Sequence, residues 1–286
     1  MISDNKKIEI LVPLHITGFF APFFTKDPLF CGSIGAGLIL EPKIKCCLEV
    51  SQETEIFFNG EKIKIEPVKE VLKAFENPKV KIQIFSPVCM GVGYGTSGAV
   101  ALGVALGLCK LFKKPKKEGA KIAHLSEVKC LTGLGDVLAI FCGKELAVRT
   151  TPGAPGIGKV RSFFQKKDIK ILTCDLKREN TKKMLKKITP KIAFLGEKLT
   201  KDFLKNPTLE NFFQFSQIFA KEIGWQKKEL FKKLEKIEKF CIGFSIKKGV
   251  LFLGVKKDNL KKVSLFLKNE ISKNFHVFKL SRLKNV

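Results

Sequence analysis

The stretch of sequence that decides the fold of this chain reads Ser86-Pro-Val-Cys-Met-Gly-Val-Gly-Tyr-Gly-Thr-Ser-Gly-Ala99. Three glycines at a spacing of two, Gly91, Gly93 and Gly95, lead into Thr96-Ser97-Gly98 and then into a run of small apolar residues. Glycines allow tight turns and let the backbone approach a ligand closely. The apolar run is long enough for a buried helix, whose free N–H groups and positive dipole end attract anions. The stretch therefore predicts a phosphate-binding loop at the start of a helix.

A simpler interpretation is a glycine-rich connection into a core helix with Thr96 or Ser97 as its cap, because glycine clusters also arise by chance. The stretch is not a Walker A motif, since no Gly-Lys-Ser/Thr follows at the required spacing. It is not the loop of a dinucleotide-binding fold either, since no acidic residue lies at the usual distance on a second strand. A phosphate site at this loop requires a different family.

The length and composition favour a folded cytosolic protein. A chain of 286 residues with 26 Phe can form one large domain or two of ordinary size. The first residues lead directly into a strand-like segment, Ile8–Val12, without the pattern of a signal peptide. The most apolar run, residues 99–108, is too short to span a bilayer. We therefore expect a cytoplasmic protein without a membrane partner.

The nine cysteines are expected to be reduced thiols. No Cys-x-x-Cys occurs, Cys46 and Cys47 are adjacent, and the others are scattered through apolar segments. When a cytosolic chain has an odd number of irregularly spaced cysteines, most of them are buried, reduced thiols. We expect no zinc site.

The positive charge is concentrated in the second half of the chain. Residues 1–160 carry 21 basic and 15 acidic side chains, whereas residues 161–286 carry 32 and 12. Such asymmetry occurs in nucleic-acid-binding proteins. However, only four basic residues are Arg, the group that reads bases and phosphates with a bidentate fork, and the Lys doublets are spread evenly. We therefore expect a solvated lysine surface and no specific nucleic-acid partner.

The hydrophobic periodicity predicts strands and glycine-rich turns in the first half, and helices followed by a β-β-α-β segment in the second. Asn59-Gly60 is a strong hairpin signal. The Pro/Gly-rich segment 151–158 is the best candidate for a domain junction, which predicts domains at 1–158 and 159–286 in an α+β fold. The expected strands are 8–12, 38–50 with a break at Pro42, 55–58, 62–65, 79–85, 137–141, 146–150, 170–174, 242–247, 250–255 and 275–280. The expected helices are 67–76, the run after the glycine loop, 117–129, 181–187, 193–205, 209–223, 228–239 and 258–269.

Six motifs in order make the chain resemble the GHMP kinase superfamily and, within it, the archaeal pantoate kinases. Six ordered motifs are far more specific than one glycine loop, and they cover the first half of the chain. The motifs are His15-Ile-Thr-Gly-Phe-Phe, Gly32-Ser-Ile-Gly-Ala-Gly, Gly93-Tyr-Gly-Thr-Ser-Gly-Ala, Ala123-His-Leu-Ser-Glu-Val, Thr132-Gly-Leu-Gly-Asp-Val and Arg149-Thr-Thr-Pro-Gly-Ala-Pro-Gly.

The resemblance implies a two-domain GHMP kinase fold. Its N-terminal domain would resemble ribosomal and translation-factor domains, and its C-terminal domain would be a ferredoxin-like α/β sandwich. The third glycine-rich motif of the superfamily is degenerate here, around Gly243 or Gly249. The part that the second half plays in the site therefore stays open at this point.

The resemblance also implies roles for individual residues. The loop with Gly91, Gly93, Gly95, Thr96, Ser97 and Gly98 would wrap the triphosphate of ATP. Ser97 and Glu127 would hold Mg²⁺, which prefers hard oxygen ligands and takes one or two from the protein. Asp136 would orient or deprotonate the acceptor hydroxyl, together with Ser97 and Glu127 as the catalytic set.

The substrate that the resemblance implies is pantoate, a small hydroxy acid. Its carboxylate needs a cation, and Arg149 is the only arginine among the motifs. His15 and Ser33 are further candidates for substrate contacts. Each residue also has a simpler interpretation: Glu127 as a solvated helix residue, Asp136 as a turn residue bonded to its own backbone, and His15 as a packed residue at a strand end.

The expected function is the ATP-dependent phosphorylation of the 4-hydroxyl of (R)-pantoate in coenzyme A biosynthesis, by a homodimer. One alternative is a GHMP kinase for another small alcohol, such as mevalonate or homoserine. A basic RNA-associated protein is the other alternative, although it would have no use for an ordered set of a glycine loop, Glu127 and Asp136.

Overall fold

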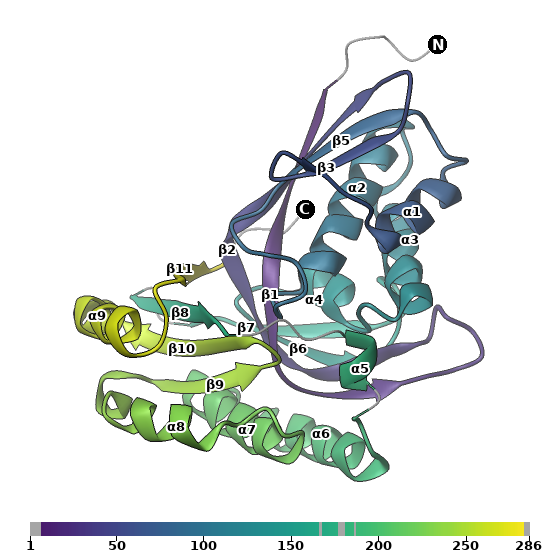
Figure 1. Cartoon of the computed structure of the whole chain (residues 1–286). Coiled ribbons are helices and arrows are strands. Elements are labelled where there is room, and N and C mark those ends of the chain that lie inside the picture. Colours follow the sequence, from purple (N-terminus) through teal and green to yellow (C-terminus); the bar gives the residue numbers. More distant parts are fainter. Residues whose placement is uncertain (1–6, 166–167, 177–180, 186, 283–286) are drawn as a thin grey trace.

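Two long antiparallel strands, β1 (Ile8–Phe23) and β2 (Gly32–Val50), form the centre of the molecule (Figure 1). The structure is a computed structural model that describes residues 7–165, 168–176, 181–185 and 187–282. β1 is buried almost throughout from Val12 to Ala21. The helix α2 (Thr96–Leu111) packs on it near its start, and α6 (Pro190–Phe203) and α7 (Leu209–Glu222) pack near its end. Because both faces of the strand are covered, its sequence is apolar without the alternation of polar and apolar residues seen in half-exposed strands.

One sheet connects both halves of the chain. Its order is β4-β3-β5-β2-β11-β8-β10-β9, and β1 and β6 also pair with β2 while β7 pairs with β6. The last strand, β11 (Phe275–Leu280), makes the connection: residues 275–278 pair with β8 and residues 279–280 with β2. The other strands are β3 (Glu55–Phe58), β4 (Glu61–Lys62), β5 (Val80–Phe85), β6 (Leu146–Thr151), β7 (Lys159–Phe163), β8 (Ile169–Asp175), β9 (Gly243–Lys247) and β10 (Val250–Lys256).

The helices form two groups (Figure 1). In the first half, α2 (Thr96–Leu111) packs on β1 and β2, and α1 (Glu66–Ala74), α3 (Lys116–Cys130) and α4 (Asp136–Cys142) surround it. In the second half, α6 and α7 pack on β1, and α9 packs on β8 and β10. These later helices are α5 (Thr181–Leu185), α6 (Pro190–Phe203), α7 (Leu209–Glu222), α8 (Lys228–Glu235) and α9 (Leu260–Glu270).

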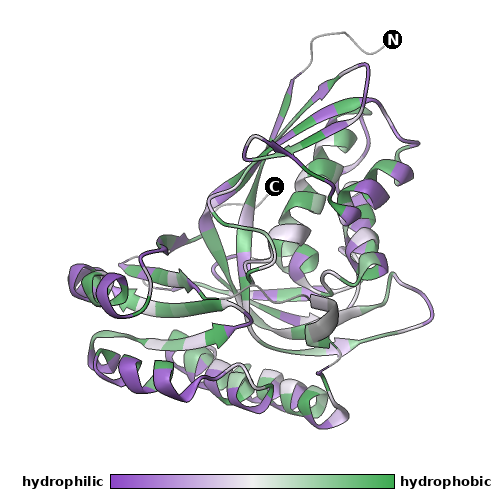
Figure 2. Ribbon diagram, in the orientation of Figure 1, coloured by the Kyte–Doolittle hydropathy of each residue, from purple (hydrophilic) through white to green (hydrophobic). Residues whose placement is uncertain are grey.

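The helix α2 is far more apolar than α8 and α9 in the second half of the chain. Nearly every residue of α2 is buried, so its small apolar side chains form the core of the first half. The helices α8 and α9, by contrast, carry many hydrophilic residues (Figure 2). Each has few buried residues, Leu234 in α8 and Val263 and Leu267 in α9. Within the described ranges, no helix is both long enough and apolar enough to cross a membrane.

The structure confirms the α+β class and most of the predicted elements, including the hairpin at Asn59-Gly60. The predicted strand 137–141 is wrong: these residues belong to the helix α4, with Ala139 N–H bonded to the Gly135 carbonyl. A short apolar run buried on all sides does not show by periodicity whether it is helix or strand. The predicted strand 62–65 is also mostly wrong, because strand pairing ends at Lys62. β2 starts earlier than predicted and continues through Pro42.

The Pro/Gly-rich segment 151–158 connects β6 to β7. These two strands pair antiparallel, so Lys159–Phe163 lies beside β6 in the same sheet. The division of the chain into domains at 1–158 and 159–286 stays a prediction.

Candidate active site

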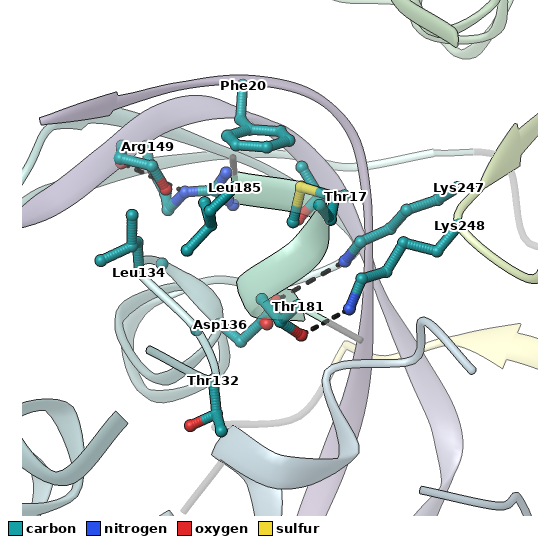
Figure 3. A pocket seen from close by; sticks show the side chains of 14 residues that line it. Thr17, Phe20, Thr132, Leu134, Asp136, Arg149, Thr181, Leu185, Lys247 and Lys248 are labelled. Atoms are coloured by element: carbon teal, nitrogen blue, oxygen red, sulfur yellow. Dashed lines mark hydrogen bonds and ion pairs between the residues drawn. The ribbon is translucent and has the colours of Figure 1, made fainter. Parts of the chain in front are cut away.

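A cavity lies where the β1–β2 pair meets the β9–β10 turn and the segment before α4 (Figure 3). It collects both charged and apolar side chains, from both halves of the sequence. The lining residues are Thr17, Phe20, Ser33, Thr132, Gly133, Leu134, Gly135, Asp136, Arg149, Thr181, Met184, Leu185, Lys247 and Lys248.

Asp136 is the acidic residue at the centre of the charged part. It is the first residue of α4, and the glycine-flanked turn before it brings its side chain into the cavity, where 16% of it is exposed. Its Oδ1 lies 2.7 Å from Nδ1 of His15 and 3.9 Å from Nζ of Lys247. Arg149 also lies close enough to act on it electrostatically. A carboxylate with three basic neighbours is held in the ionised form.

The pKa values follow from this arrangement. Burial alone would raise the pKa of Asp136, but Lys247, the hydrogen bond from His15 and Arg149 together outweigh it and hold the pKa well below its usual range. Burial lowers the pKa of Lys247, and Asp136 opposes that shift. Burial also lowers the pKa of His15 to about 4, so its imidazole is neutral at physiological pH. The net charge near Asp136 is therefore positive, with Lys247 and Arg149 against one carboxylate.

Arg149 lies on β6 with only 1% of its surface exposed, and it lines the cavity. Its Nε donates to the backbone carbonyl of Ser33 at 3.3 Å, and its Nη1 lies 3.4 Å from Nε2 of His15. Burial lowers the pKa of this guanidinium to about 10, so it stays charged at physiological pH. A buried, positively charged fork at the wall of a cavity suits a carboxylate ligand.

Glu127, on α3, is a second acidic residue and lies close to Asp136. The side-chain hydroxyls of Ser97 and Thr132 both donate to its Oε1 at 2.6 Å. Only 2% of Glu127 is exposed, and burial raises its pKa to about 7. Among the described residues its buried Oε2 has no hydrogen-bond partner. An unpaired carboxylate oxygen beside a serine hydroxyl is a donor set that fits Mg²⁺.

The structure shows no larger acidic cluster: in the parts of the chain it describes, no three His, Cys, Asp or Glu side chains gather as a metal site. Mg²⁺ beside a nucleotide needs no such cluster, because it keeps several waters and takes phosphate oxygens as further ligands. Two oxygen ligands such as those of Ser97 and Glu127 would be enough from the protein for such an ion.

The glycine loop connects β5 to α2 and is fixed from several sides. Gly95 stands immediately before α2 with φ +65°, and a Cβ there would lie 3.2 Å from the carboxylate of Asp136, so a side chain would be both strained and crowded. The hydroxyl of Tyr94 donates to Asp175 at 2.6 Å, and the Val92 carbonyl accepts from the Gly249 N–H at 3.1 Å. No side chain of the described residues caps α2. The loop thus presents backbone groups at a helix N-terminus next to Asp136.

Comparison with known proteins places this site in a family. Residues 65–144 match the model of the GHMP kinases N-terminal domain. The chain is 34% identical to the pantoate kinase of Methanocaldococcus jannaschii over 275 residues, which is 93% of this chain and 100% of that protein. It is 33% identical to the pantoate kinase of Thermococcus kodakarensis, over 81% of this chain and 82% of that protein. The chain belongs to the pantoate kinase family. It is therefore a kinase of the GHMP superfamily, as the six motifs predicted.

Solved structures confirm the GHMP kinase fold. A structure described as a phosphotransferase related to the CoA biosynthesis pathway superposes with a TM-score of 0.88 at 28% identity, and covers 98% of this chain and 97% of its own. The Methanococcus jannaschii mevalonate kinase superposes with a TM-score of 0.71 at 14% identity, over 97% and 99% of the two chains. At that identity the likeness shows the fold alone.

The structure brings the predicted site residues of this GHMP kinase into two adjoining groups. Ser97 and Glu127 form one group, and His15, Asp136 and Arg149 form the other, with Ser33 at the cavity wall. His15 is fully buried and contacts Asp136 and Arg149, and it is not among the cavity-lining residues. The predicted nucleotide residues Gly91, Gly93, Gly95, Thr96 and Gly98 lie in the loop and the first turn of α2, also outside the lining.

Sequence reasoning missed the contribution of the second half. Lys247, at the end of β9, has 7% of its side chain exposed and forms an ion pair with Asp136. Lys248 lines the same cavity and its Nζ donates to Thr181 at 2.6 Å. Among so many lysine doublets, Lys247-Lys248 carries no distinguishing pattern. The adjacent Gly249, one of the two places suggested for the third motif, does contact the glycine loop.

Proposed function

We propose that this chain transfers the γ-phosphoryl group of ATP to the 4-hydroxyl of pantoate, with Mg²⁺ as the metal. The observation that supports this most directly is the division of the site. An ionised carboxylate with two buried cations adjoins a Ser–Glu pair suited to a metal, and Gly98 in the first turn of α2 lies close to both Asp136 and Glu127. The names of the curated relatives support the same substrate.

Asp136 binds the acceptor hydroxyl in this mechanism. Because its pKa lies well below the usual range, Asp136 is a weak base and acts mainly as a hydrogen-bond acceptor that points the hydroxyl oxygen at the phosphoryl group. Phosphoryl transfer passes through a loose transition state, in which positioning and charge stabilisation supply most of the rate. The hydroxyl proton leaves late, as the new P–O bond forms, and Asp136 is positioned to receive it.

The rest of the cavity fits pantoate in particular. Arg149 binds the substrate carboxylate, and Phe20, Leu134, Met184 and Leu185 provide an apolar wall for the two methyl groups on its third carbon. Homoserine would place an ammonium group near Arg149 and Lys247, where a cation is disfavoured. The apolar wall and the basic cluster therefore favour pantoate over homoserine.

The donor side is formed by α2 and α3. The N–H groups at the start of α2 bind phosphate oxygens of the nucleotide. Ser97 and Glu127 would hold Mg²⁺, which would supply positive charge against the phosphates. Lys247 lies on the acceptor side of the same space, where its charge keeps Asp136 ionised and balances the transferred phosphoryl group.

An ATP-coupled assay with pantoate, mevalonate and homoserine tests this proposal. We expect ADP release with pantoate at a kcat/KM at least about tenfold above that of either other alcohol, the scale of one well-placed contact. A higher kcat/KM with mevalonate or homoserine would contradict the proposal and identify a different GHMP kinase.

We propose that the lysine-rich surface is solvated and binds no specific nucleic acid. Any RNA retention should be weak and should fall steeply between about 50 and 200 mM salt, as counterion release requires. Sequence-selective RNA binding that survives physiological salt would contradict this. The homodimeric state remains a prediction of the family resemblance, and the cytoplasmic location remains a prediction from the sequence.

A further inference from the structure

His15 contacts the glycine loop, Asp136 and Arg149 at the same time. It lies on β1 in the first of the six motifs and is fully buried. Its backbone N–H donates to the carbonyl of Tyr94 in the glycine loop at 3.0 Å, while its ring contacts Asp136 on one side and Arg149 on the other. The mechanism above assigns it no role.

The two ring contacts determine where the proton of the imidazole lies. Arg149 is a donor only, so Nε2 of His15, 3.4 Å from its Nη1, must be the unprotonated acceptor. The proton of the neutral ring is then on Nδ1, which donates to Oδ1 of Asp136 at 2.7 Å. The other neutral tautomer would place two donors face to face at Nε2 and leave Nδ1 without a proton for the carboxylate.

The opposite strand is built around this ring. A Cβ at Gly37 of β2 would lie 2.2 Å from Nε2 of His15, so only glycine leaves room for the imidazole. Burial keeps the ring neutral by lowering the pKa of His15 to about 4. A neutral ring of fixed tautomer and fixed position can orient a carboxylate without exchanging a proton with it.

We propose that His15 is a positioning residue that links Arg149 to Asp136: the neutral imidazole accepts from the guanidinium through Nε2 and holds the carboxylate through Nδ1–H. Binding of an anionic group at Arg149 and orientation of Asp136 toward the acceptor hydroxyl are thereby coupled. The inference rests on the proposed function, in which Arg149 binds the substrate carboxylate and Asp136 binds the hydroxyl.

Substitutions at His15 separate this role from simple packing. His15→Asn keeps an N–H donor near the position of Nδ1, whereas His15→Leu is of similar size and has no donor. We expect His15→Leu to lower kcat by about ten- to a hundredfold, the scale for a misplaced group in a site. His15→Asn should recover most of that loss while nucleotide KM stays unchanged in both. Equal losses in the two variants, or activity within twofold of wild type in both, would overturn the proposal.

Two further measurements keep the test decisive if a His15 variant is unstable. Gly37→Ala should displace the ring and lower kcat in the same way, although Gly37 is not among the cavity-lining residues. Unchanged kcat in a folded Gly37→Ala would contradict the coupling. In the wild-type protein, the ¹⁵N chemical shifts of His15 should show a neutral ring protonated on Nδ1. A ring protonated on Nε2 or on both nitrogens would overturn the inference.

The spectroscopic result does not depend on which alcohol is the substrate. If wild-type protein fails to phosphorylate pantoate but the tautomer is as stated, the proposed function fails while the contact stands. If pantoate is phosphorylated and the tautomer differs, the positioning role alone fails.

Discussion

Asp136 and Glu127 are two carboxylates of one site, and their surroundings shift their pKa values in opposite directions. Both lose water on burial, which raises a carboxyl pKa. Around Asp136 the cations and the histidine outweigh burial, and its pKa falls well below the usual range. Around Glu127 the neighbours that stabilise its charge are mainly two hydroxyls, and its pKa rises to about 7. The protein therefore supplies positive charge beside Asp136, whereas beside Glu127 it supplies mainly neutral hydroxyl donors.

The opposite pKa shifts suit the two carboxylates to different tasks, binding a hydroxyl and binding a metal ion. A carboxylate already paired with protein cations is available to hydrogen-bond a hydroxyl but has little attraction for a metal. A half-protonated carboxyl with a free oxygen gains most from a divalent cation, since the metal replaces the proton. The following predictions remove one member of this comparison at a time.

Asp136→Asn should have the largest effect. The amide keeps the size of the side chain but cannot accept the hydroxyl with the same charge, so turnover should fall at least about a hundredfold while nucleotide binding persists. Steady-state kinetics and a nucleotide-binding assay measure this, with Asp258→Asn on the exposed surface as the control. Turnover within a few-fold of wild type would remove Asp136 from the mechanism.

Arg149→Lys should come next. Lysine keeps the charge but loses the planar fork and the contacts to Ser33 and His15. The KM for pantoate should rise, and kcat/KM should fall by one to two decades, equivalent to about 1.5–3 kcal/mol for a hydrogen bond to a charged group. Arg161→Lys, exposed on β7, is the matched control. With an amide analogue of pantoate, which lacks the carboxylate, kcat/KM should differ less between mutant and wild type. An unchanged pantoate KM would mean that another residue binds the carboxylate.

The candidate site residues from the first half of the chain could be predicted from the sequence, because each lies in a short motif. The residues Ser97, Glu127 and Asp136 stand in short motifs whose spacing survives in the sequence, and the family resemblance assigns their roles. The fold class followed from the same motifs. Contacts such as that of Ser97 with Glu127 then require only that α2 and α3 pack together, which their small apolar residues favour.

What the sequence could not show depends on distant pairing. Lys247 meets Asp136 only because β9 and β10 join β8, and β8 joins β2 through β11. Because lysines are so frequent in this half of the chain, the sequence around Lys247 does not indicate that its side chain is buried. The helix α4 was mistaken for a strand for a related reason, since its burial on all sides removes the periodicity that would reveal it.

Lys247→Met tests whether the positive charge of Lys247 keeps Asp136 ionised. With this cation removed, burial of Asp136 is less well opposed, so its pKa rises and its ionised fraction falls as pH is lowered. Wild-type kcat should show no acid limb from Asp136 above pH 5, whereas the variant should lose activity progressively toward acid pH. At pH 8 we expect a loss of about tenfold, or about 1.4 kcal/mol of transition-state stabilisation. Lys257→Met, which is exposed, is the control, and identical pH profiles would contradict the role of Lys247.

The magnesium response tests the donor side and should be the smallest effect. Protonated Glu127 cannot bind the cation, so the half-saturating Mg²⁺ concentration should rise as pH falls below about 7, where its pKa lies. One displaced proton gives at most about a tenfold change per pH unit. Above that pH the curves should converge, because Glu127 is then ionised without the metal.

Ser97→Ala sharpens this last test. The substitution removes a metal ligand and also the hydrogen bond that lowers the pKa of Glu127, so the pKa rises further and the pH dependence extends to higher pH. The half-saturating Mg²⁺ concentration should increase while the pantoate KM is little changed. Thr132→Val is the matched control, because it removes the other hydroxyl on Glu127 Oε1 and leaves the serine ligand in place. If Ser97→Ala shifts the magnesium curve no further than Thr132→Val does, the hydroxyl of Ser97 is not a metal ligand and acts only through its hydrogen bond to Glu127, a stability term of about 1.5–3 kcal/mol for a charged acceptor.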